Sequence, residues 1–499
     1  MAGNEELSTP LIVGEPPREG ASEASGGSTH QITSEESVIQ RPRSIWNGED
    51  VNASQSPTPN TPIQKVPNIL RCNKDFNKYL EPMVVSIGPY HYNKVKLKPG
   101  ETLKLKLQKQ FIRTRDKSVL YHKILNNIER LRNCYDKEAT KIYNDETLAR
   151  MLFVDGCSVL YFVHCYVNDE SLLQKLKIKH HEVVFMLRDL FLLENQLPFG
   201  VLKELMGSEF EYDGVWKRQI QEFIRMDIER PRRLQEPHII KKGLIGTPDQ
   251  TNNRNPLLWI EPPHLLHLLR GGLIRTPDQS NNPETQVTMN GTSHILDISG
   301  GPRGKSIEKT KDWHSFRNVT ELKAVGIHLK ASDTNCVTDV SFKSSCCFCF
   351  CTHLKLPRIT VDSSTMAKFL NLVAYEMTPG FVNGLEVTSY ICFLDSLIDH
   401  PNDVKELRED QVLYNFLGSD KEVAKLFNMI SNDLVPNPEL YKSVIASIQK
   451  HFHCRYNTWI AKGLSDHFSS PWTMIAFFAA IFVIILTFLQ TYYTMFPPT

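Results

Sequence analysis

A single uncharged run near the C-terminus limits what this chain can fold into. Residues 472–493 contain no Asp, Glu, Lys or Arg; Trp472 begins the run, and Tyr492 and Tyr493 end it. A membrane-spanning helix needs about 20 mostly apolar residues, and aromatic residues are preferred at both interfaces. The alternative is a buried core helix, but such helices are usually amphipathic and this run is apolar all round. The sequence therefore predicts one transmembrane helix over 470–493, anchored by these three aromatic residues.

The charges beside this run predict the orientation of the chain. Lys450, Arg455 and Lys462 precede the run, and no Lys or Arg follows it. Because positive charge prefers the cytoplasmic side, we expect a single-pass, tail-anchored protein with a cytosolic body. The plasma membrane is one candidate compartment. The first ten residues are polar and acidic, which is not the pattern of a secretory signal.

Composition divides the remaining chain into a leader and a body. Residues 1–62 are rich in Ser, Glu, Pro, Gly and Thr, so they hold too little apolar surface to offset the entropy of ordering. We expect a disordered leader there and a mainly helical domain over 63–465. The formal net charge is +1, so the chain has no large positive charge that would attract nucleic acid, and we expect no nucleic-acid partner.

Apolar spacing predicts a mainly α body with a minor β element. A capping box is expected at Ser419 with Glu422, and Ser363 or Ser364 is expected to cap the helix that follows it. A break is expected at Pro198. The predicted helices are Leu103–Cys134, Thr147–Val167, His180–Met206, Thr388–Ile398, Val404–Phe416 and Glu439–Lys462, and the β-like stretches are 335–342 and 354–361.

Residues 231–312 differ from the helical body, since they hold many Pro, Gly, Asn and Thr residues. They also contain a duplication, in which Gly243–Asn253 recurs with few changes at Gly272–Asn282. Two copies are too few for a solenoid, so we expect a variable surface loop. Between the copies, Pro263–Leu269 predicts a short helix or strand.

No motif for a cofactor, a metal or a catalytic nucleophile has the required spacing. The Gly-Lys-Ser at 304–306 resembles the end of a phosphate loop, but Ser299 stands where that loop needs glycine. His181-Glu182 is not followed by the second histidine of a zinc helix, and no Gly-x-Ser-x-Gly elbow occurs. We therefore expect no catalytic, cofactor-binding or metal-binding residue from these motifs.

Cys346–Cys351 is the densest thiol cluster, with four cysteines. They are too closely spaced for one tetrahedral zinc site, and no matching pair lies elsewhere. Two interpretations stay open. The cluster is either lipidated beside Phe348 and Phe350, or it is an insertion that lengthens a β-hairpin.

Three carboxylates lie in strongly apolar stretches, namely Asp155, Asp189 and Glu194. A charge in such surroundings must be paired or have a shifted pKa, which makes these residues candidates for acid–base chemistry. The alternative is structural: an internal ion pair with Arg150 or Arg188, or capping of the backbone amides before Pro198.

Three motifs lie at Val84–His91, Val154–Cys157 and Asp189–Phe199. At these residues the chain resembles the plant family named domain of unknown function 247, over roughly residues 63 to 490. Later stretches that resemble the family include Asn371–Glu376 and Leu417–Ala424. The residues in the opening and central motifs are Gly88, Pro89, Tyr90, His91, Asp155, Gly156, Asp189, Glu194, Asn195, Gln196 and Pro198.

The resemblance implies a membrane-associated protein with no established enzymatic activity and no agreed catalytic residues. Some grass members are implicated in pollen–stigma self-recognition, which suits a binding role. We therefore expect a membrane-tethered, non-enzymatic recognition or scaffold module that contacts a protein partner through loops 231–312 and 343–353. The alternative is an enzyme built around Asp155, Asp189 and Glu194.

Overall fold

The computed structural model describes eight stretches of the chain. The leader 1–62 and the cysteines of 346–351 lie outside them, so the expectations for those segments stay predictions. The described residues are 63–207, 214–229, 261–274, 317–343, 352–381, 384–432, 434–453 and 471–495.

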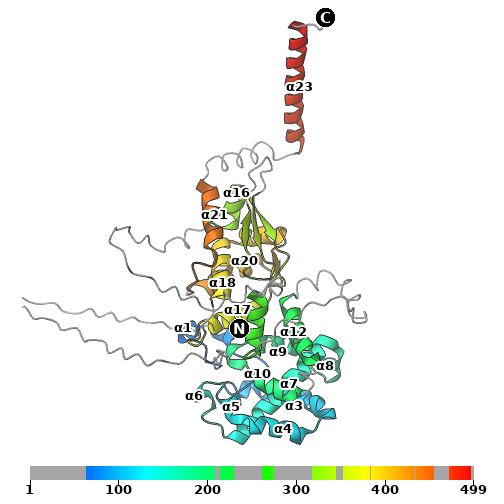
Figure 1. Ribbon diagram of the computed structural model, residues 1–499, viewed down its shortest axis with the longest axis vertical. Coiled ribbons are helices and arrows are strands. Elements are labelled where there is room, and N and C mark those ends of the chain that lie inside the picture. The colour runs from blue at the N-terminus through cyan, green and yellow to red at the C-terminus, as the bar shows by residue number, and fades with distance from the viewer. Residues whose placement is uncertain are drawn as a thin grey trace, which may run out of the picture. The chain divides into compact units, whose positions relative to one another are not determined.

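The described residues are mainly helical, which confirms the predicted fold class (Figure 1). The α-helices are α1 Asn68–Cys72, α2 Asn77–Leu80, α3 Lys98–Phe111, α4 Lys117–Asn126, α5 Ile128–Arg132, α6 Lys137–Thr140, α7 Asp145–Asn168, α8 Ser171–Lys175, α9 His180–Asp189, α10 Phe199–Met206, α12 Val215–Ile228, α15 Leu265–Ile274, α16 Val319–Ala324, α17 Thr365–Glu376, α18 Glu386–Leu397, α19 Pro401–Glu409, α20 Asp420–Ser431, α21 Lys442–His453 and α23 Pro471–Met495. Short 3-10 helices are η1 Val95–Leu97, η2 Ile112–Thr114 and η3 Leu193–Asn195.

The minor β element consists of two small sheets. One has the order β1-β3-β2, in which β1 is parallel and β2 antiparallel to β3, and the other pairs β4 with β5 in parallel. The strands are β1 Ile327–Ala331, β2 Ser341–Lys343, β3 Thr352–Leu356, β4 Ile359–Val361 and β5 Leu413–Asn415.

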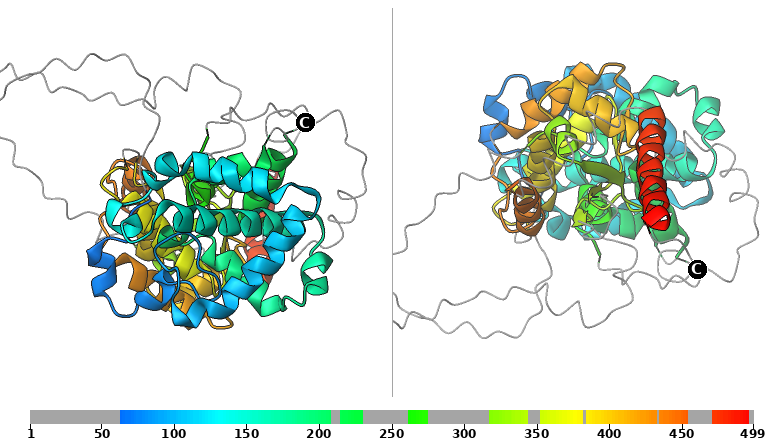
Figure 2. Two further views of the ribbon diagram at one scale, coloured as in Figure 1. Left: turned by 90° about the horizontal axis from the view of Figure 1, so that it is seen from below. Right: turned by 90° about the horizontal axis from the view of Figure 1, so that it is seen from above.

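Helix α7 is the centre of the first part of the body. It fits the prediction over 147–167 and starts slightly earlier, because the side chain of Asn144 accepts a hydrogen bond from the Thr147 amide and caps it. Helices α3, α4, α10 and α12 all pack on it, and the blue-to-green helices in Figure 2 form this layer. The apolar surface of α7 is therefore buried in the core by these helices.

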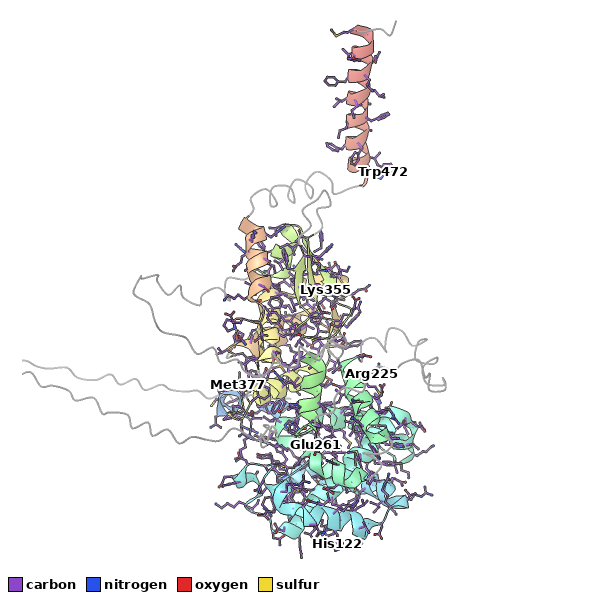
Figure 3. The ribbon with its side chains drawn as sticks, in the orientation of Figure 1. His122, Arg225, Glu261, Lys355, Met377 and Trp472 are labelled. Carbon is purple, nitrogen blue, oxygen red and sulfur yellow. The ribbon has the colours of Figure 1, made fainter. Side chains whose placement is uncertain are left out.

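Two described helices are long and apolar enough to cross a membrane, and their burial separates them. In α7 the relevant stretch is 78% buried, whereas Ile475–Tyr492 of α23 is 0% buried. Trp472 is exposed at the start of α23 (Figure 3). Tyr492 is also exposed, and the side chain of Tyr493 lies outside the described residues. Thus α7 is a core helix and α23 is the candidate membrane span.

The single helix predicted over Leu103–Cys134 is wrong, because α3, α4 and α5 divide this stretch. The break before α4 has a local cause. The Asp116 carboxylate accepts hydrogen bonds from the amides of Ser118 and Val119, at 2.8 and 3.2 Å, and starts a new helix instead of continuing α3. The stretch 180–206 is likewise divided, with the break ending at Pro198 as predicted.

The helix predicted over Val404–Phe416 is wrong in its second half. Helix α19 ends at Glu409, Gln411 has a positive φ of 57°, and β5 then pairs with β4. The left-handed residue stops the helix, and the partner strand lies far away in sequence. Local periodicity does not report such a pairing. Strand β1 was not predicted for the same reason.

The β-like stretch 335–342 is mostly irregular, since β2 begins only at Ser341. The stretch 354–361 contains β3 and β4, separated at Pro357, which has no amide hydrogen to donate to a ladder. The predicted β-hairpin is present, because β2 and β3 are antiparallel with Lys343 opposite His353. The cysteine cluster therefore belongs to the connection of this hairpin.

Ser364 and Ser419 are the N-cap residues of α17 and α20, as predicted, but the predicted capping by their side chains is wrong. The side chains of Ser364 and Ser419 make no capping hydrogen bond to α17 or α20. Before α17, Asp362 takes the role of acceptor, because its carboxylate receives the Ser364 amide and hydroxyl at 2.8 and 2.7 Å. A carboxylate is also favoured there by the helix dipole.

The predicted variable loop 231–312 is interrupted by an ordered element, the helix α15. Leu266 and Leu269 of α15 are buried in the core, and the buried Arg270 forms an ion pair with Glu376 at 2.7 Å. The short apolar stretch between the duplicated segments is thus a core helix. Only the segments on either side of α15 remain candidates for variable loops.

Two helical glycines differ in the space available for a side chain, so together they provide a matched test of packing. A Cβ on Gly100 of α3 would lie 1.9 Å from the Val84 carbonyl oxygen, whereas one on Gly271 of α15 would meet nothing within 4 Å. We expect Gly100→Ala to destabilise the protein by about 2 kcal/mol through overpacking. Gly271→Ala should stabilise it by about 1 kcal/mol through helix propensity. Urea unfolding of both variants in detergent would contradict this packing if their order were reversed.

Candidate functional site

The motif residues gather around one irregular segment, Met83–His91, which connects α2 to η1. Asp155 reaches it from α7, Asp189 from the end of α9, and Asn195 from η3. We call these three side chains, together with Lys104, Glu194 and Gln196, the polar hub. Its members come from four separate stretches of sequence.

Asp189 holds the start of the segment. Its buried carboxylate accepts hydrogen bonds from the amides of Met83, Val84 and Val85, at 3.0, 2.7 and 3.1 Å. Burial raises the pKa of Asp189 to about 6, while the three amides oppose this rise. One carboxylate thus accepts the three amide hydrogen bonds that a neighbouring β-strand would otherwise accept.

Asp155 holds the turn at the end of the segment. Its carboxylate lies 2.5 Å from Lys104 Nζ and accepts the Gly88 amide at 2.8 Å. Lys104 also donates to the Ser86 carbonyl oxygen at 2.6 Å, and both charged side chains are 1% exposed. Burial raises the pKa of Asp155 to about 6, against the opposing charge of Lys104. The pair is therefore a buried ion pair fixed to the backbone.

Gly88 is required by this arrangement. Its φ is +71°, and a Cβ there would lie 2.9 Å from both the Gln196 carbonyl oxygen and the Tyr135 hydroxyl. The Tyr135 hydroxyl already donates to that carbonyl at 3.0 Å. A side chain at this position would therefore suffer both backbone strain and a clash.

Glu194 ties the beginning of the body to the hub. Its carboxylate accepts the Val66 amide at 2.8 Å and the Arg71 guanidinium at 2.5 Å. His91 Nε2 lies 3.6 Å from Glu194, and neither ring nitrogen makes a hydrogen bond with a described residue. Burial lowers the pKa of His91 to about 3, so the ring is neutral near pH 7 and adds no ion pair.

The amides of Asn195 and Gln196 complete the network. Asn195 accepts the Ile87 amide at 2.8 Å and donates to the Val85 carbonyl oxygen at 3.1 Å. Gln196 donates to the Leu190 carbonyl oxygen at 2.7 Å and accepts an amide of α15 at 3.0 Å. Through these bonds the hub also reaches the helix that interrupts the predicted loop.

The remaining motif residues play separate packing roles. A Cβ on Gly156 would lie 2.5 Å from Leu205, so this glycine lets α7 and α10 approach closely. Tyr90 donates to the Ile63 carbonyl oxygen at 2.7 Å, and the Pro89 carbonyl oxygen accepts from a tyrosine. Pro198 precedes α10 and ends the break predicted there.

The predicted ion pairs of the carboxylates with Arg150 and Arg188 are wrong. Arg150 is exposed, and Arg188 donates to the carbonyl oxygens of Lys78 and Glu81. The cations that do pair, Lys104 and Arg71, lie far away in sequence, and no local pattern marks them. Asn371 accepts a hydrogen bond from the Leu193 amide at 2.8 Å, and its motif, Asn371–Glu376, gives no local sign of this contact.

Neither of the two hollows described here is lined by a residue of the polar hub. The larger described hollow, about 350 Å³, is lined by Glu129, Arg130, Asn133 and Cys134, and the other lies beside α12, α15 and α17. Among the described residues no group of three His, Cys, Asp or Glu side chains is placed to hold a metal. The geometry of the hub satisfies buried backbone groups.

Asp189→Asn separates a structural from a catalytic role. An amide keeps one acceptor but turns its NH₂ donor toward the amides of 83–85, so a buried donor loses its partner. We expect a loss of about 3 kcal/mol in the free energy of unfolding. Asp75→Asn, at an exposed position, is the matched control and should change it little. Unchanged stability of Asp189→Asn in urea unfolding would contradict the structural role.

Comparison with known proteins finds matches over most of the chain. The model of the family DUF247, described as plant protein of unknown function, matches residues 63–486. The UPF0481 protein At3g47200 of Arabidopsis thaliana is 26% identical over 428 residues, covering 83% of this chain and 82% of that protein. The putative UPF0481 protein At3g02645 of the same plant is 25% identical, covering 87% and 90%. No solved structure matches the chain. The chain therefore belongs to the DUF247 family of plant proteins of unknown function.

Proposed function

We propose that this protein is a membrane-tethered, non-enzymatic recognition or scaffold module that acts through contacts with a protein partner. One observation carries the proposal. The carboxylates that sequence reasoning singled out, Asp155, Asp189 and Glu194, are buried and bonded to the protein's own backbone and cations. Groups occupied in this way hold a scaffold together and are not free to act on a substrate.

The tether is supported by α23. Its stretch Ile475–Tyr492 exposes large side chains that water solvates poorly, such as Phe478, Phe482 and Phe488, at 60%, 61% and 75% exposure. An apolar helix of this length is suited to the hydrocarbon core of a bilayer. The positive charges before it favour a cytosolic body.

We assign the partner surface to three segments that connect described elements. Residues 230–260 and 275–316 flank α15, and 344–351 connects the paired strands β2 and β3. Each segment starts and ends in an element that packs into the described body. Variable connections on a rigid scaffold are where binding residues are commonly found.

The loops are tested by deletions that leave α15 in place. Deleting 235–300 would remove a core helix, so we specify two separate Gly/Ser replacements, of 235–258 and of 278–312. We expect at least one to lose partner proteins captured by proximity labelling of the full chain, while its melting temperature stays near that of the parent. Replacement of leader residues 2–50 is the control. Unchanged capture by both variants would contradict the loop assignment.

Orientation is tested by protease protection on sealed membranes, with one tag at the N-terminus and another after Thr499. We expect the N-terminal tag to be digested and the C-terminal tag to survive. A variant without 471–495 should leave the membrane fraction after carbonate extraction, whereas the loop variants should stay there. Survival of the N-terminal tag would instead show that the body lies on the lumenal or extracellular side of the membrane. Membrane retention of the truncated variant would refute the tether.

A further inference from the structure

A second, smaller cavity lies outside the polar hub, where α12, α15, α17 and β4 meet. Its volume is about 90 Å³, which is several times the space that one ordered water needs. Cavities that hold nucleotides or drug-sized molecules are about 300–1,000 Å³, so this cavity suits a molecule of only a few heavy atoms. Its polar lining residues are Asp227, Asn335, Arg358, Thr360, Asp362, Thr365 and Lys368.

Most charges on the cavity wall already have partners. Lys368 lies 2.5 Å from Asp227 and neutralises it. Asp362 accepts the amide and hydroxyl of Ser364 at the start of α17. These three charged side chains line the cavity, but they already have partners in the protein and do not need a ligand.

Arg358 is different. It forms no ion pair or hydrogen bond with another residue in the described stretches, and its Nε is buried without a hydrogen-bond partner. A guanidinium stays charged at any physiological pH and offers five donors, so a buried unpaired donor there is costly. A small anion at this position would satisfy it.

Thr360 carries the second unpaired group. Its hydroxyl oxygen is buried and makes no hydrogen bond with a described residue, although it lines the same cavity two residues beyond Arg358. The two groups thus offer donors from one short stretch, at the beginning of β4. A carboxylate has two oxygens that accept hydrogen bonds, which matches two such donors.

The rest of the wall is apolar. Leu269 and Leu273 contribute from α15, and Phe369 and Leu372 contribute from α17. A purely inorganic anion would leave this surface without a partner. A carboxylate with a short hydrocarbon part would contact both kinds of lining. Its charged group would lie at Arg358, and its apolar atoms would pack against the leucines.

We propose that this cavity binds a small organic carboxylate of a few carbon atoms. Arg358 and Thr360 donate to its carboxylate, and Leu269, Leu273, Phe369 and Leu372 contact its hydrocarbon part. The site is independent of the partner-binding role and joins α15 and α17 to β4. A bound carboxylate therefore adds contacts between three elements of the core.

The test uses the full chain in detergent micelles and sodium propionate as the probe. Propionate should raise the melting temperature saturably, beyond the effect of sodium chloride at equal ionic strength, and propionamide should not. A rise that equals that of sodium chloride, or that propionamide reproduces, would overturn the proposal. So would the absence of any effect of propionate.

Two variants and a control locate the site. Arg358→Gln and Thr360→Val should each weaken propionate binding, by about tenfold or more for the arginine, as expected for loss of a charge-assisted hydrogen bond. Both variants should stay folded, because Arg358 Nε and the Thr360 hydroxyl make no hydrogen bond with a described residue that the substitution would remove. Lys330→Gln removes an equal charge from an exposed position of β1 and should bind propionate like the parent. Parent-like binding by Arg358→Gln, measured by calorimetry, would refute this location.

Discussion

The fold depends on how the first part of the irregular segment Met83–His91, residues Met83–Gly88, is buried. Its residues from Val85 onward lie in the core without belonging to a helix or strand, so their amides need acceptors from elsewhere. Asp189, Asn195 and Asp155 supply those acceptors. Side chains thus take the place of a partner strand, and a buried amide left unpaired would cost about 1–3 kcal/mol.

This solution ties distant parts of the chain to one another. The end of α9 and η3 must lie beside the segment for Asp189 and Asn195 to reach it, and α7 must present Asp155 together with Lys104 of α3. Gly100 of α3 then fits directly against the segment. A buried ion pair adds little net stability by itself, because desolvation opposes the attraction. Its value here lies in fixing the relative positions of α3, α7 and the segment.

Strong motifs in an apolar setting therefore have a structural explanation in this protein. Acidic residues among leucines and phenylalanines indicate shifted pKa values, and burial does raise the pKa of Asp155 and Asp189 to about 6. The same shift arises wherever carboxylates serve buried amides, so it does not distinguish catalysis from architecture. What the structure shows is that these two carboxylates accept hydrogen bonds from backbone amides of the segment 83–88.

The sequence by itself determined the features that depend on local composition and periodicity. These are the mainly helical class, the buried helix α7, the apolar helix α23 and the break that ends at Pro198. It also indicated that Asp155, Asp189 and Glu194 have unusual surroundings. Only the tertiary structure decided their partners, the pairing of β4 with β5, and the place of α15 in the core. The reason is physical: hydrogen bonds and ion pairs such as Lys104 with Asp155 join residues far apart in sequence, and no local periodicity encodes them.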